Sequence, residues 1–329
     1  MKAIGWTTII TAAWLLFFQC GSGWPVFDQD TNKNEVASPS SCRYTILSVD
    51  RKIRIPFEIF RNKFRFQARV NGKECHLLLD NGSLWDEILF FGSPAVDALG
   101  LKTSGETSLG PNKADTAENI RVEFDDIVFD GLSAVITRYD PKLPNLWAGT
   151  EGQLSATFFK NFVVRIDFDA AAIELIAPEN FRYAGAGQEL AMRPGPFNSR
   201  LVAADIELPD GKTIGLELLI DLGGIYPLYL PLGKYEEIAI PEGAAEMTLG
   251  AGMRVQKGFL GQVPAIRLGK LLLKDVQTAF ITVGKDVGVY GNTMIGLPLL
   301  RNFNVIFDYF NERMILEPTP TITGGSLAK

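Results

Sequence analysis

Short apolar runs that end in turn residues fill most of the chain after residue 50. Examples are FRFQARVNGKECHLLLD, IRVEFDDIVFDGLSAVI, LVAADIELPDGKTIGLELLID and QVPAIRLGKLLLKDVQTAFI. Such runs, rich in β-branched and aromatic residues and separated at close intervals by Gly, Pro, Asn or Asp, are typical of antiparallel strands and hairpins. The clearest turns are VNGKE and LPDGKT, because Asn-Gly and Asp-Gly readily adopt positive φ. The pattern predicts a mainly β fold.

The chain also repeats part of itself at a fixed spacing. HLLLDNGSLW, with Asp80, matches ELLIDLGGIY, with Asp221. FFKNFVVRIDFDAAAIELIAP, with Asp167, matches LLRNFNVIFDYFNERMILEP, with Asp308, and both pairs of aspartates are 141 residues apart. Two separate segments that share one spacing indicate an internal duplication. We expect one lobe over residues 51–182, a second over 190–318, and a tail of residues 319–329.

Each half leads an apolar strand directly into an aspartate that is followed by x-Gly. Burying a carboxylate is costly unless something nearby uses it. A duplicated fold with a pseudo-twofold axis would bring Asp80 and Asp221 together at that axis, where each carboxylate faces the other across a cleft.

The first residues predict export. Residues 1–23, MKAIGWTTIITAAWLLFFQCGSG, have one early lysine, an uncharged apolar stretch and then small residues, which is the pattern of a secretory signal peptide. Cys20 follows that stretch as the lipidated cysteine of bacterial lipoproteins does, although Gln19 stands where those signals usually have Gly, Ala or Ser. The alternatives are a membrane anchor through lipid on Cys20 or simple cleavage nearby. Residues 24–50 are predicted to form a linker and N-terminal segment, and the protein to be periplasmic or anchored to the envelope.

Cysteine usage fits an oxidising compartment. With Cys20 removed or lipidated, Cys42 and Cys75 remain as an even number. A Cys42–Cys75 bridge would fasten the N-terminal segment to the strand that leads into Asp80. Two unpaired buried thiols are the alternative.

Asp-x-Gly-Ser after an apolar run resembles the active-site loop of aspartic proteases, whose usual form is Asp-Thr/Ser-Gly. TMIGLPLLRNFNVIFDY resembles the strand and short helix that support this loop in retropepsin-like domains, and RMILEP fits the closing strand. The resemblance covers nearly all of residues 57–318 and is to bacterial, exported, two-lobed members of the retropepsin/pepsin group. It implies two tandem closed β-barrel lobes with a cleft between them. Because both lobes lie in one chain, it also implies a monomer.

The resemblance implies that Asp80 and Asp221 are the catalytic carboxylates. Two aspartates too close to ionise together share one proton, so one acts as a base on a water molecule while the other protonates the carbonyl of the scissile peptide. The pair titrates as a unit, so neither role is assigned to one residue. Gly82 and Gly223 would offer amide donors, and Ser83 would donate to Asp80. The full set of supporting residues is Asn81, Gly82, Ser83, Leu222, Gly223, Gly224, Ser155 and Gly296.

Three of these residues depart from the family pattern. Asn81 and Leu222 stand where Thr or Ser hydroxyls normally cross-link the two loops, and Leu cannot hydrogen-bond through its side chain. Ser155 stands where the second half has Gly296, which is tolerable only if φ is negative and there is space beneath the loop. Two functions therefore stay open: an aspartic endopeptidase acting on extended peptides or unfolded protein, and an inactive relative that binds a peptide or protein partner. A glycosidase would need its carboxylates farther apart than a shared proton allows.

Other features exclude several classes of function. A net charge of −6 gives no reason to expect nucleic acid, and no cofactor motif is present. His76 is the single histidine and lies within a predicted strand, so neither Ser-His-Asp chemistry nor a zinc site is expected. KTSGETSLGPNKAD and TLGAGMRVQKGFLG follow the two aspartates at equivalent places and are candidate hairpin flaps.

Overall fold

The computed structural model contains 59% strand and 9% helix, which confirms the predicted mainly β class. It describes residues 43–49, 51–83, 85, 87–109, 112–138, 148–196, 199–251, 254–282 and 292–319. The predicted signal peptide, Cys20, Cys42 and most of the C-terminal tail lie outside these residues. No helix among the described residues is long and apolar enough to span a membrane.

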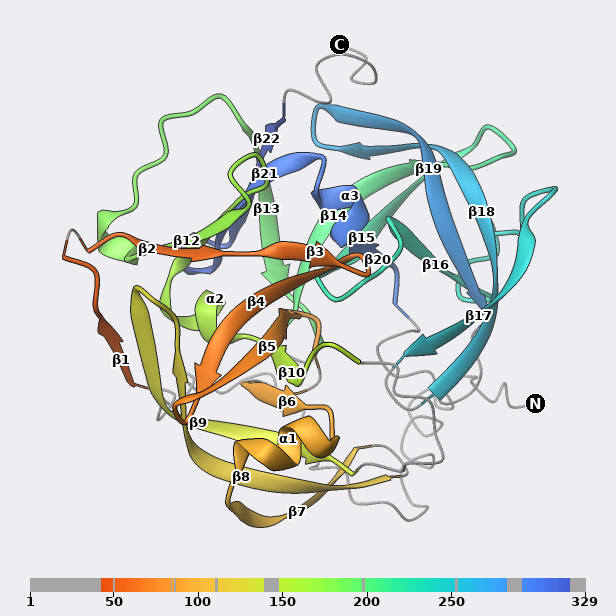
Figure 1. Cartoon of the computed structure of the whole chain (residues 1–329). Coiled ribbons are helices and arrows are strands. Elements are labelled where there is room, and N and C mark those ends of the chain that lie inside the picture. The colour runs from red at the N-terminus through yellow and green to blue at the C-terminus, as the bar shows by residue number, and fades with distance from the viewer. Residues whose placement is uncertain are drawn as a thin grey trace, which may run out of the picture.

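The first sheet is built from residues before 155 (Figure 1). Its strands pair in the order β1-β9-β6-β10-β5-β4-β8-β7, with β3 beside β4. Because β8 and β9 also pair, strands β4, β5, β10, β6, β9 and β8 form a closed ring. The bounds are β1 Arg43–Ile46, β3 Glu58–Phe60, β4 Lys63–Val70, β5 Lys73–Leu79, β6 Ile88–Phe90, β7 Thr103–Leu109, β8 Asn112–Glu123, β9 Ile127–Thr137 and β10 Gly152–Leu154, with helix α1 at Pro94–Leu99.

The second sheet contains a closed six-stranded barrel made of β14, β15, β20, β16, β19 and β18. The pairing of β14 with β18 closes it, and β17 extends β18 as a hairpin. The bounds are β14 Arg200–Glu207, β15 Thr213–Asp221, β16 Leu228–Leu232, β17 Ala245–Ala251, β18 Arg254–Leu268, β19 Leu271–Thr282 and β20 Met294–Gly296.

Six further strands continue the second sheet in the order β13-β22-β21-β11-β12-β2, so segments from both ends of the chain share it. In Figure 1, β2 and β12 lie at the left and β13, β21 and β22 at the top, with most of the first sheet below them and the barrel to their right. The bounds are β2 Ile53–Pro56, β11 Val163–Asp167, β12 Ala172–Ile176, β13 Gln188–Pro194, β21 Phe303–Asp308 and β22 Arg313–Pro318, with helices α2 Thr157–Asn161 and α3 Leu297–Leu300 and 3-10 helices η1 Pro178–Asn180 and η4 Tyr309–Asn311.

Equivalent strands pair in the same way in the two sheets. The β4–β5 and β14–β15 pairs are antiparallel, whereas the β5–β10 and β15–β20 pairs are parallel. Between β11 and β21, Val164 pairs with Phe307 and Ile166 with Val305. Adding 141 to 164 gives 305 and subtracting 141 from 307 gives 166, so the shift between the halves turns the Val164–Phe307 pair into the Val305–Ile166 pair. The register of the central pair is therefore unchanged when the two halves are exchanged.

Alternating apolar residues explain why these segments form strands. In β4, Phe64, Phe66, Ala68 and Val70 are all buried, as a period of two requires for a strand with one face in the core. The end of β5, residues 77–79, is instead three consecutive buried leucines, because both faces of that strand are covered. Burying each such side chain contributes about 1.5–3 kcal/mol. The core thus holds rigidly the strand end from which Asp80 emerges.

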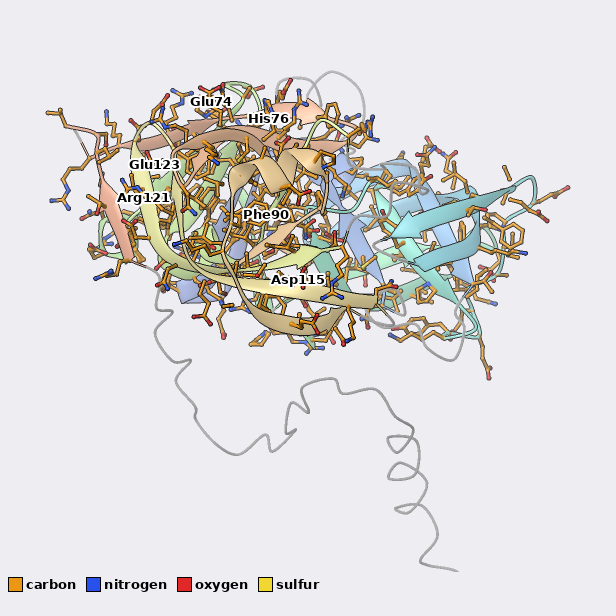
Figure 2. All side chains as sticks on the ribbon, turned by 60° about the horizontal axis from the view of Figure 1, so that its bottom comes forward. Glu74, His76, Phe90, Asp115, Arg121 and Glu123 are labelled. Atoms are coloured by element: carbon orange, nitrogen blue, oxygen red, sulfur yellow. The ribbon has the colours of Figure 1, made fainter. Side chains whose placement is uncertain are left out.

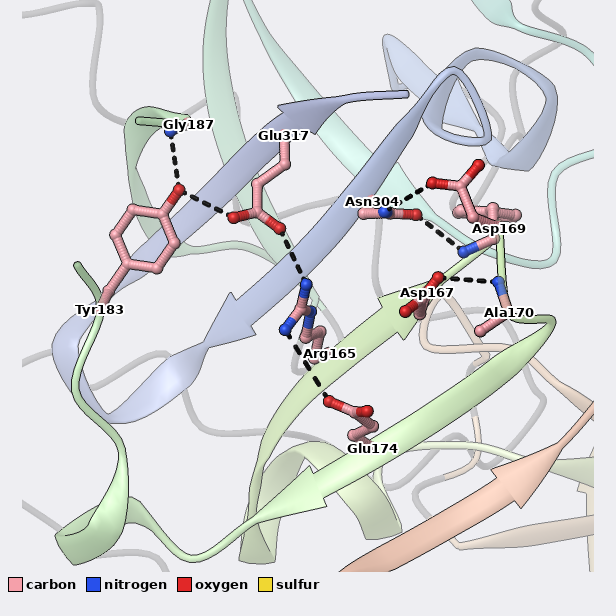
Figure 3. A network of polar contacts seen from close by, with 10 residues as sticks. Arg165, Asp167, Asp169, Ala170, Glu174, Tyr183, Gly187, Asn304 and Glu317 are labelled. Atoms are coloured by element: carbon pink, nitrogen blue, oxygen red, sulfur yellow. Dashed lines mark hydrogen bonds and ion pairs between the residues drawn. The ribbon is translucent and has the colours of Figure 1, made fainter. Parts of the chain in front are cut away.

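Polar contacts join the two halves across the central strands (Figure 3). Arg165 on β11 forms an ion pair with Glu317 on β22 at 3.3 Å. The side chain of Asn304 on β21 accepts from the Phe168 amide and donates to Asp169. Asp167 accepts from the Ala170 amide, so it holds the β11–β12 turn. The matching Asp308 is fully buried and caps η4 through the Asn311 amide, so each aspartate stabilises the turn that follows its strand.

Candidate functional site

Asp80 and Asp221 both stand at the end of a buried strand. Asp80 follows β5, and its amide donates to the carbonyl of Leu154 on the parallel strand β10 at 3.0 Å. Asp221 ends β15 and pairs with Gly296 on the parallel strand β20. Because β10 and β20 occupy equivalent places in their sheets, the two carboxylates are presented in the same manner.

The two loops meet, and each one packs on the other's carboxylate. A methyl group placed on Gly223 would lie 2.5 Å from the carboxyl carbon of Asp80, and one placed on Gly82 would lie 2.6 Å from Oδ1 of Asp221. Real contacts of that kind do not occur, so both positions require glycine. The carboxyl group of Asp80 is also close enough to raise the pKa of Asp221, through its charge and through a hydrogen bond. The structure therefore brings the two predicted aspartates together.

Each carboxylate also accepts a hydrogen bond from its own loop. The amide of Gly82 donates to Oδ1 of Asp80 at 3.0 Å, and the amide of Gly223 donates to Oδ1 of Asp221 at 2.7 Å. These are the amide donors expected of the two glycines. Such bonds orient a carboxylate and stabilise its ionised form.

Burial and the neighbouring charge of Asp80 raise the pKa of Asp221 from 3.8 to about 7. The ammonium of Lys63 and the amide of Gly223 act in the opposite direction and lower the pKa. The pair therefore retains a proton over the acidic range in which an isolated aspartate would have lost it. Two carboxyl groups in contact that hold one proton between them can supply an acid and a base to the same reaction.

Asn81 links the two loops in place of a pair of hydroxyls. Its Oδ1 accepts from the Leu222 amide at 2.8 Å, and its Nδ2 donates to the hydroxyl of Tyr309 at 3.1 Å. The side chain of Leu222 is fully buried in the core and contributes no hydrogen bond. The positions equivalent to Asn81 and Tyr309, 141 residues away, are Leu222 and Phe168. Two polar residues in contact, Asn81 and Tyr309, thus correspond to two apolar residues, Leu222 and Phe168, at the equivalent positions.

The remaining supporting residues are asymmetric as well. The hydroxyl of Ser83 accepts from the Trp85 amide at 3.2 Å and makes no hydrogen bond to Asp80 among the described residues. In both halves, however, the amide three residues after the aspartate donates to its carbonyl, from Ser83 to Asp80 at 3.4 Å and from Gly224 to Asp221 at 3.1 Å. A methyl group on Gly296 would lie 2.2 Å from the carbonyl oxygen of Tyr226, so this position admits only glycine.

Ser155, the first-half counterpart of Gly296, is accommodated. Its φ is not positive, and its amide donates to the Glu87 carbonyl at 2.8 Å. Its hydroxyl is buried and has no hydrogen-bond partner among the described residues. The condition stated for a serine here, negative φ, is met at the cost of one unsatisfied hydroxyl.

Sequence reasoning missed three residues that contact this site. Lys63, at the start of β4, donates to the carbonyl of Gly223. Tyr309 contacts Asn81, and the guanidinium of Arg200 lies over the Tyr309 ring at 4.4 Å. Tyr309 could have been found, because it follows Asp308 within a repeated segment and differs from Phe168 by one hydroxyl. No feature of the sequence near Lys63 indicates its contact, which depends on how the two halves pack.

The other predicted residues lie apart from the aspartate pair. His76 lies on β5 opposite Gln67 and, in Figure 2, next to Glu74. Cys75 is buried, and burial raises its pKa to about 12, whereas its predicted partner Cys42 lies outside the described residues. The described residues contain no group of three or more side chains arranged to hold a metal ion. A surface pocket of about 340 Å³ lies at Arg165, Phe181, Tyr183 and Glu317 and contains neither aspartate.

Both candidate flaps are antiparallel hairpins. Strands β7 and β8 form the first, and β17 and β18 form the second. Their tips, residues 110–111 and 252–253, lie outside the described residues.

No protein-family model matches the chain, and no curated protein matches it.

Replacing Asn81 with alanine is expected to lower the free energy of unfolding by about 1–3 kcal/mol, because the buried amide of Leu222 loses its acceptor. Tyr309→Phe is the matched control, since it removes only the contact with Asn81 Nδ2 and leaves the Leu222 link intact. Its expected cost is about 1 kcal/mol. Urea unfolding monitored by tryptophan fluorescence measures both. Equal losses in the two variants would contradict the cross-linking role of Asn81.

Proposed function

We propose that the protein is an aspartic endopeptidase of the retropepsin/pepsin type. In this proposal residues 51–182 and 190–318 are tandem lobes with a cleft between them, and Asp80 and Asp221 are its catalytic pair. The observation that carries the proposal is the mutual packing of the two loops, in which each loop glycine lies against the other lobe's carboxylate. The identical pairing pattern of the two sheets and the self-consistent β11–β21 register support the duplication.

The chemistry follows from a pair that shares one proton. The unprotonated carboxylate removes a proton from a water molecule held between the two groups, and that water attacks the scissile carbonyl carbon. The protonated carboxyl gives its proton to the carbonyl oxygen, which forms a tetrahedral gem-diol. Collapse of this intermediate returns a proton to the leaving nitrogen and breaks the carbon–nitrogen bond. The hydrogen bonds from Gly82 and Gly223 hold both carboxyl groups in position for these transfers.

The contact between the carboxyl groups favours this chemistry over glycoside hydrolysis. Retaining glycosidases hold their two carboxyl groups about 5–5.5 Å apart, and inverting ones hold them farther apart still. Asp80 is close enough to Asp221 to raise its pKa through charge and a hydrogen bond, which favours a pair that shares a proton over the wider spacing of a glycosidase. A peptide in extended conformation is the proposed substrate, bound as a strand beneath the β7–β8 and β17–β18 hairpins.

The proposed setting is the periplasm or the cell envelope. It rests on residues 1–23, whose pattern is that of a secretory signal, with Cys20 as the attachment point if the protein is lipidated. A monomer suffices, because one chain supplies both aspartates. The proposed substrates are peptides or unfolded segments of other exported proteins.

The test is to incubate the purified protein with a complex peptide library between about pH 3 and 7, and to identify new termini by mass spectrometry. The Asp221→Asn variant is the matched control, because it keeps the size of the side chain and removes the shared proton. We expect cleavage by the parent and a loss of at least about a hundredfold in the variant, since general acid–base catalysis contributes 10²–10⁴-fold.

Absence of cleavage by correctly folded parent protein would reject the endopeptidase. The buried Leu222 side chain and the unsatisfied Ser155 hydroxyl would then mark a fold that binds a peptide or protein partner between the halves without cutting it. Retention of the library peptides on immobilised protein would measure that binding.

A further inference from the structure

One cation reaches the aspartate pair from the opposite half of the molecule. Lys63 begins β4 in the first sheet, yet its ammonium donates to the carbonyl of Gly223, two residues after Asp221. Its side chain is partly buried at this contact. We propose that Lys63 is a positioning residue for the aspartate pair, in which its ammonium clamps the Gly223 carbonyl and so holds the loop that carries Asp221. The inference rests on the proposed function and names a residue that the aspartate motif does not contain.

The tight turn before Lys63 places this residue beside the Asp221 loop. Phe60 and Lys63 pair across the β3–β4 hairpin, and the two residues between them, Arg61 and Asn62, have φ of 51° and 59°. Two consecutive residues with positive φ form the tight turn that suits a two-residue hairpin, a conformation normally taken by Asn-Gly or Gly-Gly. An arginine in this conformation is strained, so the surrounding contacts must maintain it.

The same hairpin tip makes a second contact with the Asp221 loop. The side-chain amide of Asn62 donates to the carbonyl of Ile225 at 3.4 Å. Adjacent residues of the tip therefore bind the carbonyls of residues 223 and 225, one on each side of Gly224. The loop that presents Asp221 is held from across the molecule at two points.

The start of β14, the strand equivalent to β4, makes a different contact. Arg200 is the first residue of β14, as Lys63 is of β4. Its guanidinium lies over the Tyr309 ring, and Tyr309 in turn contacts Asn81. Arg200 is therefore connected with the Asp80 loop through an aromatic ring, whereas Lys63 contacts the Asp221 loop directly.

This placement predicts a specific electrostatic effect. Besides solvent exclusion, the groups that act on the Asp221 carboxyl are Asp80, Lys63 and the Gly223 amide. Asp80 raises the pKa of Asp221 and Lys63 lowers it. Removing the ammonium should therefore raise that pKa, so that the pair keeps its one shared proton to higher pH. The alkaline limb of the activity profile should move upward with it, because the singly protonated pair persists further.

The test compares Lys63→Met with Lys63→Arg in kcat/KM profiles from pH 3 to 9, on a peptide taken from the library experiment. We expect Lys63→Met to lower kcat roughly tenfold, since a displaced loop misplaces a reacting group, and to shift the alkaline limb to higher pH. Lys63→Arg keeps the positive charge, so its alkaline limb should stay at the parent's pH. Arg200→Met is the matched control, and its alkaline limb should stay with the parent's, because the groups that shift the pKa of Asp221 are Asp80, Lys63 and Gly223.

A second readout separates this inference from the proposed function. Titration of the Asp221 carboxyl carbon by ¹³C NMR requires no turnover and should give a higher pKa in Lys63→Met than in the parent. If the parent cleaves no peptide but Lys63→Met still raises the pKa of Asp221, the role of Lys63 at the pair stands and the proposed endopeptidase activity is rejected. An unmoved carboxyl titration in a folded Lys63→Met variant would overturn the inference. A rise in kcat/KM would also overturn it, since the ammonium would then be competing with substrate for the Gly223 carbonyl.

Discussion

Gly223→Ala is expected to lower kcat/KM for peptide cleavage by about a hundredfold or more. The added methyl group would lie 2.5 Å from the carboxyl of Asp80, which is closer than any real contact of this kind. The opposing atoms all belong to the half-buried carboxyl group of Asp80, so the conflict is relieved either by turning this carboxyl out of place or by moving one loop away from the other. A displacement of about 1 Å between reacting groups costs on the order of 10² in rate.

The matched control for this variant lies on β15, the strand that leads into the same loop. Gly215 on β15 also has ordinary φ, and a methyl group there would lie 3.5 Å from the Asp205 carboxylate, which is normal van der Waals distance. Gly215→Ala should therefore keep the parent's kcat/KM, and both variants should be measured on the same peptide. Near-parental activity in Gly223→Ala would show that the loops are not in contact at Gly223 and would remove the main support for the proposed pair.

The sequence was sufficient to predict those properties that depend on local pattern and repetition. The mainly β class follows from short apolar runs with Asn-Gly and Asp-Gly turns, and it is confirmed. The fixed spacing of 141 residues led to Asp80 and Asp221, and the structure places them in contact. The amide donors at Gly82 and Gly223 could likewise be predicted, because a glycine two residues after an aspartate is positioned to bond back to it.

The contacts that join the halves could not be predicted in this way. Leu222 was expected only to weaken the link between the loops, since its side chain cannot hydrogen-bond. Its backbone amide nonetheless completes a link to Asn81, and Tyr309 holds the other end of that asparagine. Every residue except proline has a backbone amide, so the residue type does not show which amide will make such a link. The contact of Lys63 with Gly223 joins residues 160 positions apart and depends on the hairpin turn at Arg61 and Asn62.

Stability should reveal the aspartate pair even without a substrate. In the unfolded chain Asp221 loses its proton near pH 3.8, whereas in the folded protein its pKa is about 7, chiefly because of burial. Between these values the folded state binds the extra proton. The contribution of Asp221 to the unfolding free energy is therefore most favourable at low pH, falls as pH rises from about 4 to 7, and is constant above that. A shift of this size corresponds to up to about 4 kcal/mol.

Asp221→Asn is accordingly expected to be more stable than the parent at pH 8, by up to about 4 kcal/mol, and to lose this advantage toward pH 4. Urea unfolding of both proteins at several pH values measures the effect, and the difference between them cancels the titration of all unrelated groups. Asp210→Asn is the control. Asp210 is fully exposed, and its hydrogen bond with Lys212 lowers its pKa, so its titration is complete below pH 5.

The control should therefore track the parent between pH 5 and 8, while Asp221→Asn should diverge from it steadily. A difference between Asp221→Asn and the parent that stays constant with pH would mean that Asp221 ionises in the folded protein as it does in the unfolded chain. The two carboxyl groups would then not share a proton. Residues placed for chemistry commonly reduce stability, because function requires a charge or a strain that folding alone would avoid. A stabilising Asp221→Asn would identify this buried carboxylate as such a residue before any substrate is known.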